Sequence, residues 1–465
     1  MYKKKAHIHF VGIGGIGMSG IAQILKIQGY TISGCDSDLH QKSIHDLKAL
    51  DCHVYEGNNT SMCKNKDIDI LVYSSAIRED NPEILAAQKR GIPTIPRALM
   101  LAELMRTKYS IAIAGSHGKT TTTSLISHIL IDARIDPTVI IGGHLKNISN
   151  NARHGNGDFL VAEADESDKS LVHLQATLAV LTNIDLEHLE TYKNLEDVKA
   201  TFEIFLNNLP FYGKAFVCID DKNIKSLLPM PHIKIIKYGL DSNLADIYAK
   251  NISLKPDCSI FTVYTKESSI PLGDITIKMP GEHNIQNCLA AITVSLDLGI
   301  SFEKIAKALQ NFKGIERRFC YMGTYKGAEI FDDYGHHPKE IRNTIKIAKK
   351  RAKKRLIVAF QPHRYTRTHK LWDNFVEIFL ESDIDKLIIT DIYPASEMPI
   401  EHITSQKLVQ EINKHNPNLE IIYAPYDENL SHIKKHIKQH AQEQDLILSL
   451  GAGKITNLAK KLDAI

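Results

Sequence analysis

Short apolar runs alternate with amphipathic stretches along most of the chain. Residues 6–11 (AHIHFV) form an apolar run that precedes a glycine turn and a stretch of helical period, and 31–36 and 71–77 are further apolar runs. This alternation predicts a parallel β-sheet in which a helix follows each strand. Residues 91–104 carry two prolines before a helical pattern, and we interpret them as the exit from a first domain.

A second unit begins with the apolar run IAIAG at 111–115. Buried-looking strands are predicted after it at 139–143, 159–166, 178–184 and 214–220. Between 232 and 279 the pattern changes to short alternating stretches, which predict antiparallel strands added to the sheet. A helix-start signal, PGEHN, follows at 280–284.

The alternation starts afresh after residue 319, and each new strand precedes a helical stretch. These strands are predicted at 328–335, 356–362, 386–394, 419–425 and 445–453. A chain of 465 residues, at roughly 150 residues per domain, suggests about three domains. We expect an α/β protein with a Rossmann-like domain at 1–107, a central phosphate-loop domain at 108–315 and a Rossmann-like C-terminal domain at 316–465. The central sheet is expected to be mostly parallel, with added antiparallel strands.

Composition narrows the class of protein. A hydrophobic content of 43% with 24% charged residues is typical of a soluble globular chain, and no apolar run is long enough to span a membrane. The net charge of +3 is too small to indicate a nucleic-acid-binding protein. The basic run at 346–355 is typical of the solvated last turn of a helix. Seven scattered cysteines without a C-x-x-C pair predict neither a disulfide framework nor a zinc knuckle, which fits a reducing cytoplasm.

The first glycine motif lies between a predicted strand and a predicted helix. Gly12, Gly14 and Gly17 form a complete G-x-G-x-x-G, and Asp36 ends the next strand. This context is that of a dinucleotide fingerprint, in which a diphosphate rests on the helix N-terminus. The motif predicts a diphosphate-binding site. It does not decide whether the ligand is NAD or another diphosphate, or whether the motif is only a structural turn. No hydride-transfer site is evident downstream, which disfavours NAD.

The second glycine motif has the shorter spacing G-x-x-G-K-T, from Gly115 to Thr120. Lys119 offers a positive charge to the β- and γ-phosphates of a nucleotide, and the Thr120 hydroxyl suits Mg²⁺. A helix cap with an incidental lysine is the alternative. The strand before the motif and the helix after it favour phosphate binding.

Acidic side chains follow two strands of this same unit. Glu163, Asp165, Glu166 and Asp168 lie at and just beyond the end of one strand, and Asp185, Glu187 and His188 lie in the same place on another. Ligands bind at such strand ends in parallel sheets, although acidic residues there also cap helices. Asn284 and Asn287 stand three residues apart on one helix face, where they pair with a base edge or cap the helix.

Together these stretches resemble one family, the Mur ligases, the ATP-dependent amide-forming enzymes of peptidoglycan assembly. The matching stretches are GIGGIGMSGIA, SSAI, AGSHGKTTTT, EADESD, LTNIDLEHLE, GEHNIQN, RRF, DDYGHHP and QPHRYTRT. They stand in the family's order and span nearly the whole chain. In two places the sequence departs from common family patterns: Ser116 replaces a threonine, and Glu203 stands where several relatives have a carbamylated lysine.

The resemblance implies a set of site residues. The UDP-substrate side comprises Gly14, Gly15, Gly17, Asp36, Ser74 and Ser75. The ATP side comprises Gly115, Ser116, His117, Gly118, Lys119, Thr120, Thr121, His283, Asn284, Asn287, Arg318 and Asp333. Thr120, Glu163 and His188 are the implied metal ligands, and Lys119, Glu163 and His188 the implied catalytic residues. His363, Arg364 and Arg367 are implied contacts of the amino acid or the sugar substrate.

The reaction implied by the resemblance needs ATP and Mg²⁺. It joins L-alanine to the carboxylate of UDP-N-acetylmuramate through an acyl phosphate and releases ADP and phosphate. A monomer or homodimer in the cytoplasm is expected, with no nucleic-acid partner and no membrane insertion. The alternatives are a ligase that recycles a murein tripeptide, a folate polyglutamylating ligase, an NAD-dependent oxidoreductase and a non-catalytic nucleotide-binding module.

Overall fold

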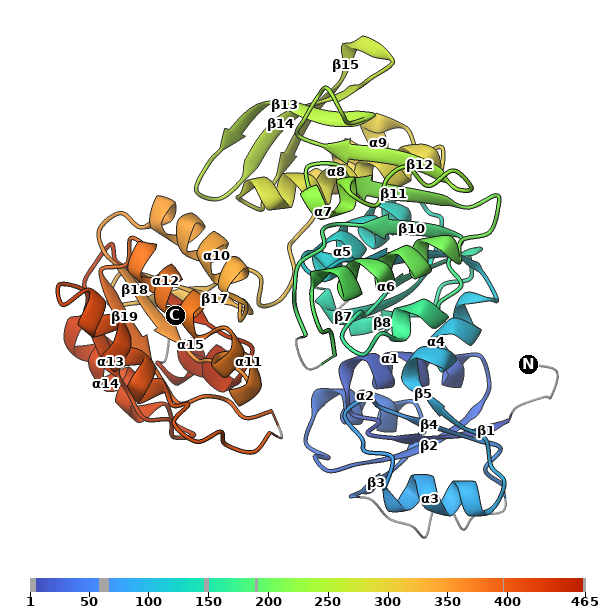
Figure 1. Cartoon of the computed structure of the whole chain (residues 1–465), viewed down its shortest axis with the longest axis horizontal. Helices are drawn as coiled ribbons and strands as arrows, with labels where there is room; N and C mark the ends of the chain where they lie inside the picture. The colour runs from blue at the N-terminus through green and yellow to red at the C-terminus, as the bar shows by residue number, and fades with distance from the viewer. Residues whose placement is uncertain (1–5, 58–66, 146–149, 189–190, 396, 463–465) are drawn as a thin grey trace.

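The structure is a computed structural model that describes residues 6–57, 67–145, 150–188, 191–395 and 397–462. It contains three β-sheets, each flanked by helices and each belonging to a different third of the chain. In Figure 1 the first sheet lies below the second, and the orange and red third unit lies to one side. The three-domain α/β architecture is the predicted one, whereas the boundaries at 107/108 and 315/316 stay predictions.

The first sheet is entirely parallel and has the order β3-β2-β1-β4-β5. Its strands are β1 (His7–Val11), β2 (Thr31–Asp36), β3 (His53–Glu56), β4 (Ile70–Tyr73) and β5 (Thr94–Pro96). Its helices are α1 (Ile16–Ile27), α2 (Lys42–Ala49), α3 (Pro82–Lys89) and α4 (Arg97–Met105). Strands are added to one side of β1 up to β3 and to its other side from β4, so the strand order switches between β1 and β4, and ligands of such folds bind at that switch point.

The second sheet has the order β15-β14-β13-β12-β11-β10-β6-β9-β7-β8. Its strands are β6 (Tyr109–Ala114), β7 (Thr138–Leu145), β8 (Asn150–Arg153), β9 (Phe159–Glu163), β10 (Leu178–Leu181), β11 (Lys214–Cys218), β12 (Lys234–Gly239), β13 (Ile247–Leu254), β14 (Ser259–Thr265) and β15 (Ser268–Ile277). Its helices are α5 (Lys119–Asp132), the 3₁₀ turn η1 (Ser170–His173), α6 (Leu195–Asn207), α7 (Lys222–Lys225), α8 (Glu282–Asp297) and α9 (Phe302–Gln310). The pairs β13–β14 and β14–β15 are antiparallel, as predicted, and β7–β8 is a further antiparallel pair at the opposite edge.

The third sheet has the order β16-β17-β21-β18-β19-β20. Its strands are β16 (Cys320–Tyr325), β17 (Ala328–Asp333), β18 (Leu356–Phe360), β19 (Lys386–Ile389), β20 (Glu420–Tyr423) and β21 (Leu446–Leu450). Its helices are α10 (Pro338–Arg351), α11 (Tyr365–Lys370), α12 (Trp372–Glu381), α13 (Ser405–His415), α14 (Ser431–His440), the 3₁₀ turn η2 (Lys454–Asn457) and α15 (Leu458–Lys461). Only β16 pairs in antiparallel fashion among the described strands of this sheet.

The basic run predicted to end a helix does end α10, but its side chains are not all solvated. Lys349 donates to Asp385 at 2.8 Å, and the Arg351 guanidinium forms two hydrogen bonds with Glu329. The run therefore ties α10 to its own domain. Among the described residues, no helix combines the length and the apolar character needed to cross a membrane.

The first domain rests on the second through α1, which packs against β7 and β8. The Asn151 amide in β8 donates to the carbonyl oxygen of Ile16, the residue that begins α1. At the start of α4, Arg97 forms an ion pair with Asp165 of the second domain at 3.3 Å. The glycine turn of the first domain is thereby fixed close to the acidic loop that follows β9.

Candidate active site between the second and third domains

Three loops meet at one edge of the central sheet because their strands are parallel neighbours. The strands β10, β6 and β9 are adjacent, and all of their pairings are parallel. The phosphate loop (residues 115–120) follows β6, while the acidic loops at 163–168 and 182–188 follow β9 and β10. The carboxyl ends of parallel strands share an edge, so both acidic loops flank the phosphate loop.

The tight spacing of the phosphate loop has a steric basis. Gly115 and Gly118 adopt φ values of +129° and +82°, which L-residues rarely adopt. A Cβ on Gly115 would lie 2.2 Å from the Thr182 hydroxyl, and one on Gly118 would lie 2.6 Å from the Asn287 side-chain oxygen. Helix α5 begins directly at Lys119, so its first N–H groups, which lack intrahelical acceptors, face the loop.

Lys119 points back into the loop and toward the acidic strand end. Its Nζ donates to the carbonyl oxygen of Gly115 at 2.6 Å and to Glu166 at 2.8 Å. Burial alone would lower the pKa of Lys119, but the carboxylates of Glu166 and Asp165 raise it above its ordinary value. The lysine is therefore a fixed positive charge at the position where a nucleotide phosphate would lie.

The predicted metal ligands fall into two groups. Glu163 accepts a hydrogen bond from the Gly142 N–H at 3.0 Å and one from the Thr120 hydroxyl, and burial raises its pKa. His188 lies 3.5 Å from Glu166, and the ligand atoms of Glu166, Glu187 and His188 are all within 4.8 Å of one another. Thr120 thus lies beside Glu163. His188 lies instead beside the carboxylates of Glu166 and Glu187, which were not among the predicted metal ligands.

Two of the predicted site residues other than glycine adopt left-handed backbone conformations. His188 has φ +51° and Arg364 has φ +72°, although both carry a Cβ. Such strain persists only where the surrounding structure imposes it, and it concentrates at functional sites.

A cavity of about 560 Å³ lies between the phosphate loop and the third domain. Its lining includes eight of the residues predicted for the ATP side: His117, Gly118, Thr121, His283, Asn284, Asn287, Arg318 and Asp333. The other four, Gly115, Ser116, Lys119 and Thr120, belong to the same loop but do not line the cavity. The cavity is therefore large enough for a nucleotide and borders the helix end that would receive its phosphates.

Polar groups of the cavity wall are held in place by hydrogen bonds. Asn284 donates to the Pro280 carbonyl oxygen at 2.8 Å, and Asn287 accepts from the Thr122 hydroxyl at 3.2 Å. Asp333, at the end of β17, accepts from the Phe319 and Gly335 N–H groups, each at 2.8 Å. Burial raises the pKa of Asp333 to about 6, whereas burial and Arg318 lower that of His283 to about 4.

The predicted amino-acid contacts lie beside His188. Arg364 and Arg367 line a second, small cavity of about 20 Å³ together with Glu187, His188 and His337. His363 is not part of that lining: its ring stacks on Tyr393, and its Nδ1 accepts from Arg367 at 3.2 Å. Two of the three predicted contacts therefore reach the junction of the domains directly.

The residues predicted for the UDP side gather at the switch point of the first sheet. The Gly14 N–H donates to Asp36 at 2.8 Å, and a Cβ on Gly12 would lie 3.3 Å from that of Ser74. Gly15 is the N-cap of α1 and Gly17 lies in its first turn, with Ser75 next to Ser74 after β4. Asp36 is 9% exposed and also accepts from Gln41, so it braces the glycine turn.

Comparison with known proteins gives matches along nearly the whole chain. The family models "Mur ligase family, catalytic domain", "Mur ligase middle domain" and "Mur ligase, glutamate ligase domain" match residues 7–109, 113–295 and 317–453. The UDP-N-acetylmuramate–L-alanine ligase of Geotalea daltonii is 46% identical over 463 residues, 99% of this chain and 98% of that protein. The chain belongs to the Mur ligase family.

Solved structures agree with this assignment. The UDP-N-acetylmuramate–alanine ligase of Thermotoga maritima superposes on this Mur ligase with a TM-score of 0.81 and 26% identity, covering 98% of both chains. A murein peptide ligase from Psychrobacter arcticus gives a TM-score of 0.73 at 24% identity, again over 98% of both chains. The latter similarity concerns the fold alone.

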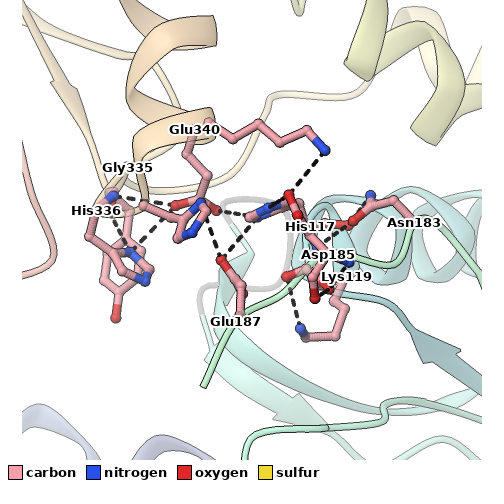
Figure 2. A network of polar contacts seen from close by, with 12 residues as sticks. His117, Lys119, Asn183, Asp185, Glu187, Gly335, His336 and Glu340 are labelled. Carbon is pink, nitrogen blue, oxygen red and sulfur yellow. Dashed lines mark hydrogen bonds and ion pairs between the residues drawn. The ribbon is translucent and has the colours of Figure 1, made fainter. Parts of the chain in front are cut away.

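Sequence reasoning missed part of this Mur ligase site. His337 and Glu340 lie at the start of α10 in the third domain and face His117 of the phosphate loop, with Glu340 at 3.6 Å. Figure 2 shows the His117 ring between Asp185 on one side and Glu187 and Glu340 on the other. The available signal was the pair of histidines before a proline at a strand end, in DDYGHHP.

Proposed function

We propose that this chain joins L-alanine to the carboxylate of UDP-N-acetylmuramate, with conversion of ATP to ADP and phosphate. The observation that carries this proposal is the 46% identity to the L-alanine ligase of Geotalea daltonii over 99% of the chain. The alanine ligase and the murein peptide ligase among the solved structures are 26% and 24% identical, so the full-length sequence identity and not the fold favours L-alanine.

The nucleotide is assigned to the cavity between the second and third domains. Lys119 and the N–H groups that begin α5 hold the phosphates, and the amides of Asn284 and Asn287 hold the base end. His283, Arg318 and Asp333 close the cavity around the rest of the nucleotide, and Gly115, Ser116, His117, Gly118, Thr120 and Thr121 shape the phosphate loop. The third domain contributes wall residues, so the nucleotide site is complete only when that domain is docked.

The UDP part of the sugar substrate is assigned to the switch point of the first sheet. Gly14, Gly15 and Gly17 let the diphosphate approach the N-terminus of α1. Ser74 and Ser75 line the nucleoside side, and Asp36 holds the glycine turn in shape through the Gly14 N–H. Arg97 lies between this turn and Asp165 of the second domain, so the substrate extends from the first domain toward the phosphate loop.

The reaction proceeds in two displacements. A carboxylate oxygen of the muramoyl group attacks the γ-phosphorus, ADP leaves and an acyl phosphate forms. The neutral amine of L-alanine then attacks the acyl carbon, phosphate leaves with the bonding electrons, and the nitrogen loses a proton to water. Lys119 neutralises negative charge on the transferring phosphoryl group, so its contribution is electrostatic. Arg364 and Arg367, beside His188, present guanidinium groups suited to the carboxylate of L-alanine, with His363 supporting Arg367.

Magnesium fits the donor groups of this junction. Thr120 and Glu163 offer a hydroxyl and a carboxylate beside Lys119, and Glu166, Glu187 and His188 offer three donor atoms within 4.8 Å of one another. Bound there, Mg²⁺ would supply further positive charge to the phosphoryl group. Glu163 and His188 are the predicted ligands, and Glu166 and Glu187 are added to them on geometric grounds.

An amino-acid panel tests the proposal. The purified protein is incubated with UDP-N-acetylmuramate, ATP and Mg²⁺, and ADP release is followed after addition of L-alanine, glycine, L-serine or the murein tripeptide. We expect ADP release with L-alanine and a product whose mass equals the two substrates joined with loss of water. Faster release with the tripeptide would identify a recycling ligase, and tight NADH binding would indicate an oxidoreductase. Because both substrates are metabolites of the cytoplasm, we place the reaction there.

A further inference from the structure

The carboxylate of Glu187 faces two different groups of side chains. Its Oε2 lies 3.9 Å from His188, on the side where Mg²⁺ is proposed. Its Oε1 lies 3.5 Å from Nδ1 of His117 and 3.6 Å from Nδ1 of His337. The second group joins three segments: the phosphate loop, the loop after β10 and the start of α10 in the third domain.

The two imidazoles of this group lack hydrogen bonds within the described part of the chain. Both ring nitrogens of His117 and of His337 are buried there without a hydrogen-bond partner. His337 is only 7% exposed. The distances to Glu187 exceed the usual hydrogen-bond range, and buried polar atoms left unsatisfied are costly. Such an arrangement requires a physical explanation.

Ion pairing with carboxylates accounts for one ring better than for the other. The His117 ring has three carboxylates around it: Asp185 at 3.5 Å from Nε2, and Glu187 and Glu340 at 3.5 and 3.6 Å from Nδ1. Among the described residues, the His337 ring has an ion-pair distance to Glu187 alone, at 3.6 Å. That distance leaves both ring nitrogens of this buried histidine without a hydrogen bond.

A metal ion accounts for both rings. Two donors bound tetrahedrally at the usual zinc distances lie about 3.4 Å apart, close to the 3.5 and 3.6 Å found here. The three donor atoms of His117, Glu187 and His337 all lie within 4.8 Å of one another. A set of two imidazole nitrogens and one carboxylate oxygen binds Zn²⁺ and related transition-metal ions in preference to Mg²⁺.

We propose that His117, Glu187 and His337 form a binding site for a divalent transition-metal ion of the zinc class, which joins the third domain to the phosphate loop. Asp185 lies where a supporting carboxylate of such a metal site is expected. Asp185 faces Nε2 of His117 from 3.5 Å, on the side opposite the ion. A carboxylate in that place orients a ligating histidine and increases its basicity.

The site has consequences for the position of the third domain. His337 is the ligand that this domain contributes, so the complete donor set exists only in the docked arrangement. An ion that binds only this arrangement stabilises it by mass action. Binding through Nδ1 requires that nitrogen to carry no proton, so the metal competes with protons for both histidines. The proposal rests on these donors and holds whichever amino acid the enzyme uses.

Cobalt provides a spectroscopic probe of this site. The full-length protein, freed of metal with a chelator, is titrated with Co²⁺ without nucleotide or sugar substrate, and then with Zn²⁺ as competitor. We expect one Co²⁺ per chain with the intense visible absorption of a four-coordinate ion, displaced by Zn²⁺. In His337→Gln the affinity for Zn²⁺ should fall by at least about tenfold, the loss typical of removing even an outer partner of a metal site.

Three further variants make the result decisive. His415→Gln removes a histidine that lies 3.0 Å from Glu411 on α13, far along the chain from the site, and should leave the spectrum unchanged. His188→Ala removes the neighbouring magnesium-side donor and should also retain it. His337→Cys should restore binding and add a thiolate-to-cobalt band in the near ultraviolet. Ion pairs between His117 and the carboxylates, without a metal, could not produce this band.

The contrary outcomes are equally specific. Unchanged Co²⁺ affinity in both His337→Gln and His337→Cys would overturn the proposal, as would loss of the visible band in His188→Ala alone. Because these titrations contain no substrate, they leave the ligase assignment untouched. Failure of ADP release with L-alanine would conversely overturn the ligase assignment and not the metal site.

Discussion

The ammonium group of Lys119 lies 2.8 Å from the carboxylate of Glu166, across the space between the loops that follow β6 and β9. This ion pair holds a positive charge at the phosphate loop. Lys119→Ala should therefore lower the ligation rate by about 1,000-fold, because the charge that stabilises phosphoryl transfer is lost. Binding of the UDP-sugar, measured by calorimetry without ATP, should stay within about twofold of wild type, since its seat lies in the first domain.

A matched variant tests whether the charge or the geometry of Lys119 matters. Lys119→Arg keeps the positive charge but replaces the ammonium with a larger planar guanidinium. The variant should therefore still bind ADP through its phosphates, while turnover stays low. Equal loss of UDP-sugar binding and turnover in Lys119→Ala would contradict the separation of the two sites.

His188→Ala should slow ligation by about 100-fold, in line with losses seen when a metal site is damaged. The imidazole is one of three donors within 4.8 Å, and two carboxylates remain after its removal. Raising the Mg²⁺ concentration should therefore recover part of the rate. His415→Gln provides the control on a surface His–Glu pair, and an unchanged rate in His188→Ala would remove this histidine from the metal site.

Local patterns in the sequence were sufficient to predict the arrangement at the central sheet. The phosphate loop, Glu163, Glu187 and His188 all lie at or just beyond the ends of predicted strands, and parallel pairing brings strand ends to one edge. The three-domain α/β fold followed from the same alternation. The site residues that could be predicted are those whose neighbours are set by sheet topology.

Contacts set by domain docking could not be predicted in this way. His337 and Glu340 meet His117 across more than two hundred residues, and no periodicity encodes that approach. The grouping of His188 with Glu166 also depends on how two loops fold over the sheet edge. The strands β3, β5, β8 and β16 were not predicted. The first three, HVYE, TIP and NNAR, are only three or four residues long, and in CYMGTY the register shifts between Tyr321 and Gly323.

Gly118→Ala should abolish nucleotide binding by deforming the phosphate loop. The position has φ +82°, and a Cβ there would lie 2.6 Å from the Asn287 side-chain oxygen. Gly299→Ala is the matched control, because it has φ +78° but no atom within 4 Å of its Cβ position. The control should cost about 1–2 kcal/mol of stability through backbone strain and leave the ADP affinity unchanged. Equal ADP affinities in the two variants would show that the contact with Asn287 is unimportant.

Arg97→Ala should raise the KM for UDP-N-acetylmuramate by about tenfold, equivalent to about 1.4 kcal/mol of binding energy. The Arg97 side chain is 17% exposed and pairs with Asp165 at 3.3 Å, and its guanidinium lies so close to Gly17 that a Cβ there would be 3.0 Å away. It therefore adds positive charge beside the diphosphate seat. The KM for ATP should change little, and Arg97→Lys should give an intermediate value. A parallel rise in both KM values would instead indicate a general loss of domain packing.

The stability of the first domain should fall as the pH drops below 6.5, partly because of His9. Burial, with a further contribution from His7, lowers the pKa of this fully buried histidine to about 4. Below pH 6.5 the unfolded chain therefore binds a proton that the folded chain excludes, so stability declines toward pH 4. Between pH 7.5 and pH 5 this difference in proton binding corresponds to about 2 kcal/mol of stability.

Amide hydrogen exchange in β1, corrected for intrinsic rates, measures the opening free energy of the first domain at each pH. His9→Asn, which keeps a polar group near the Ser33 hydroxyl that His9 contacts at 2.8 Å, should flatten this dependence by that amount. An unchanged slope in the variant would show that His9 is already protonated in the folded domain.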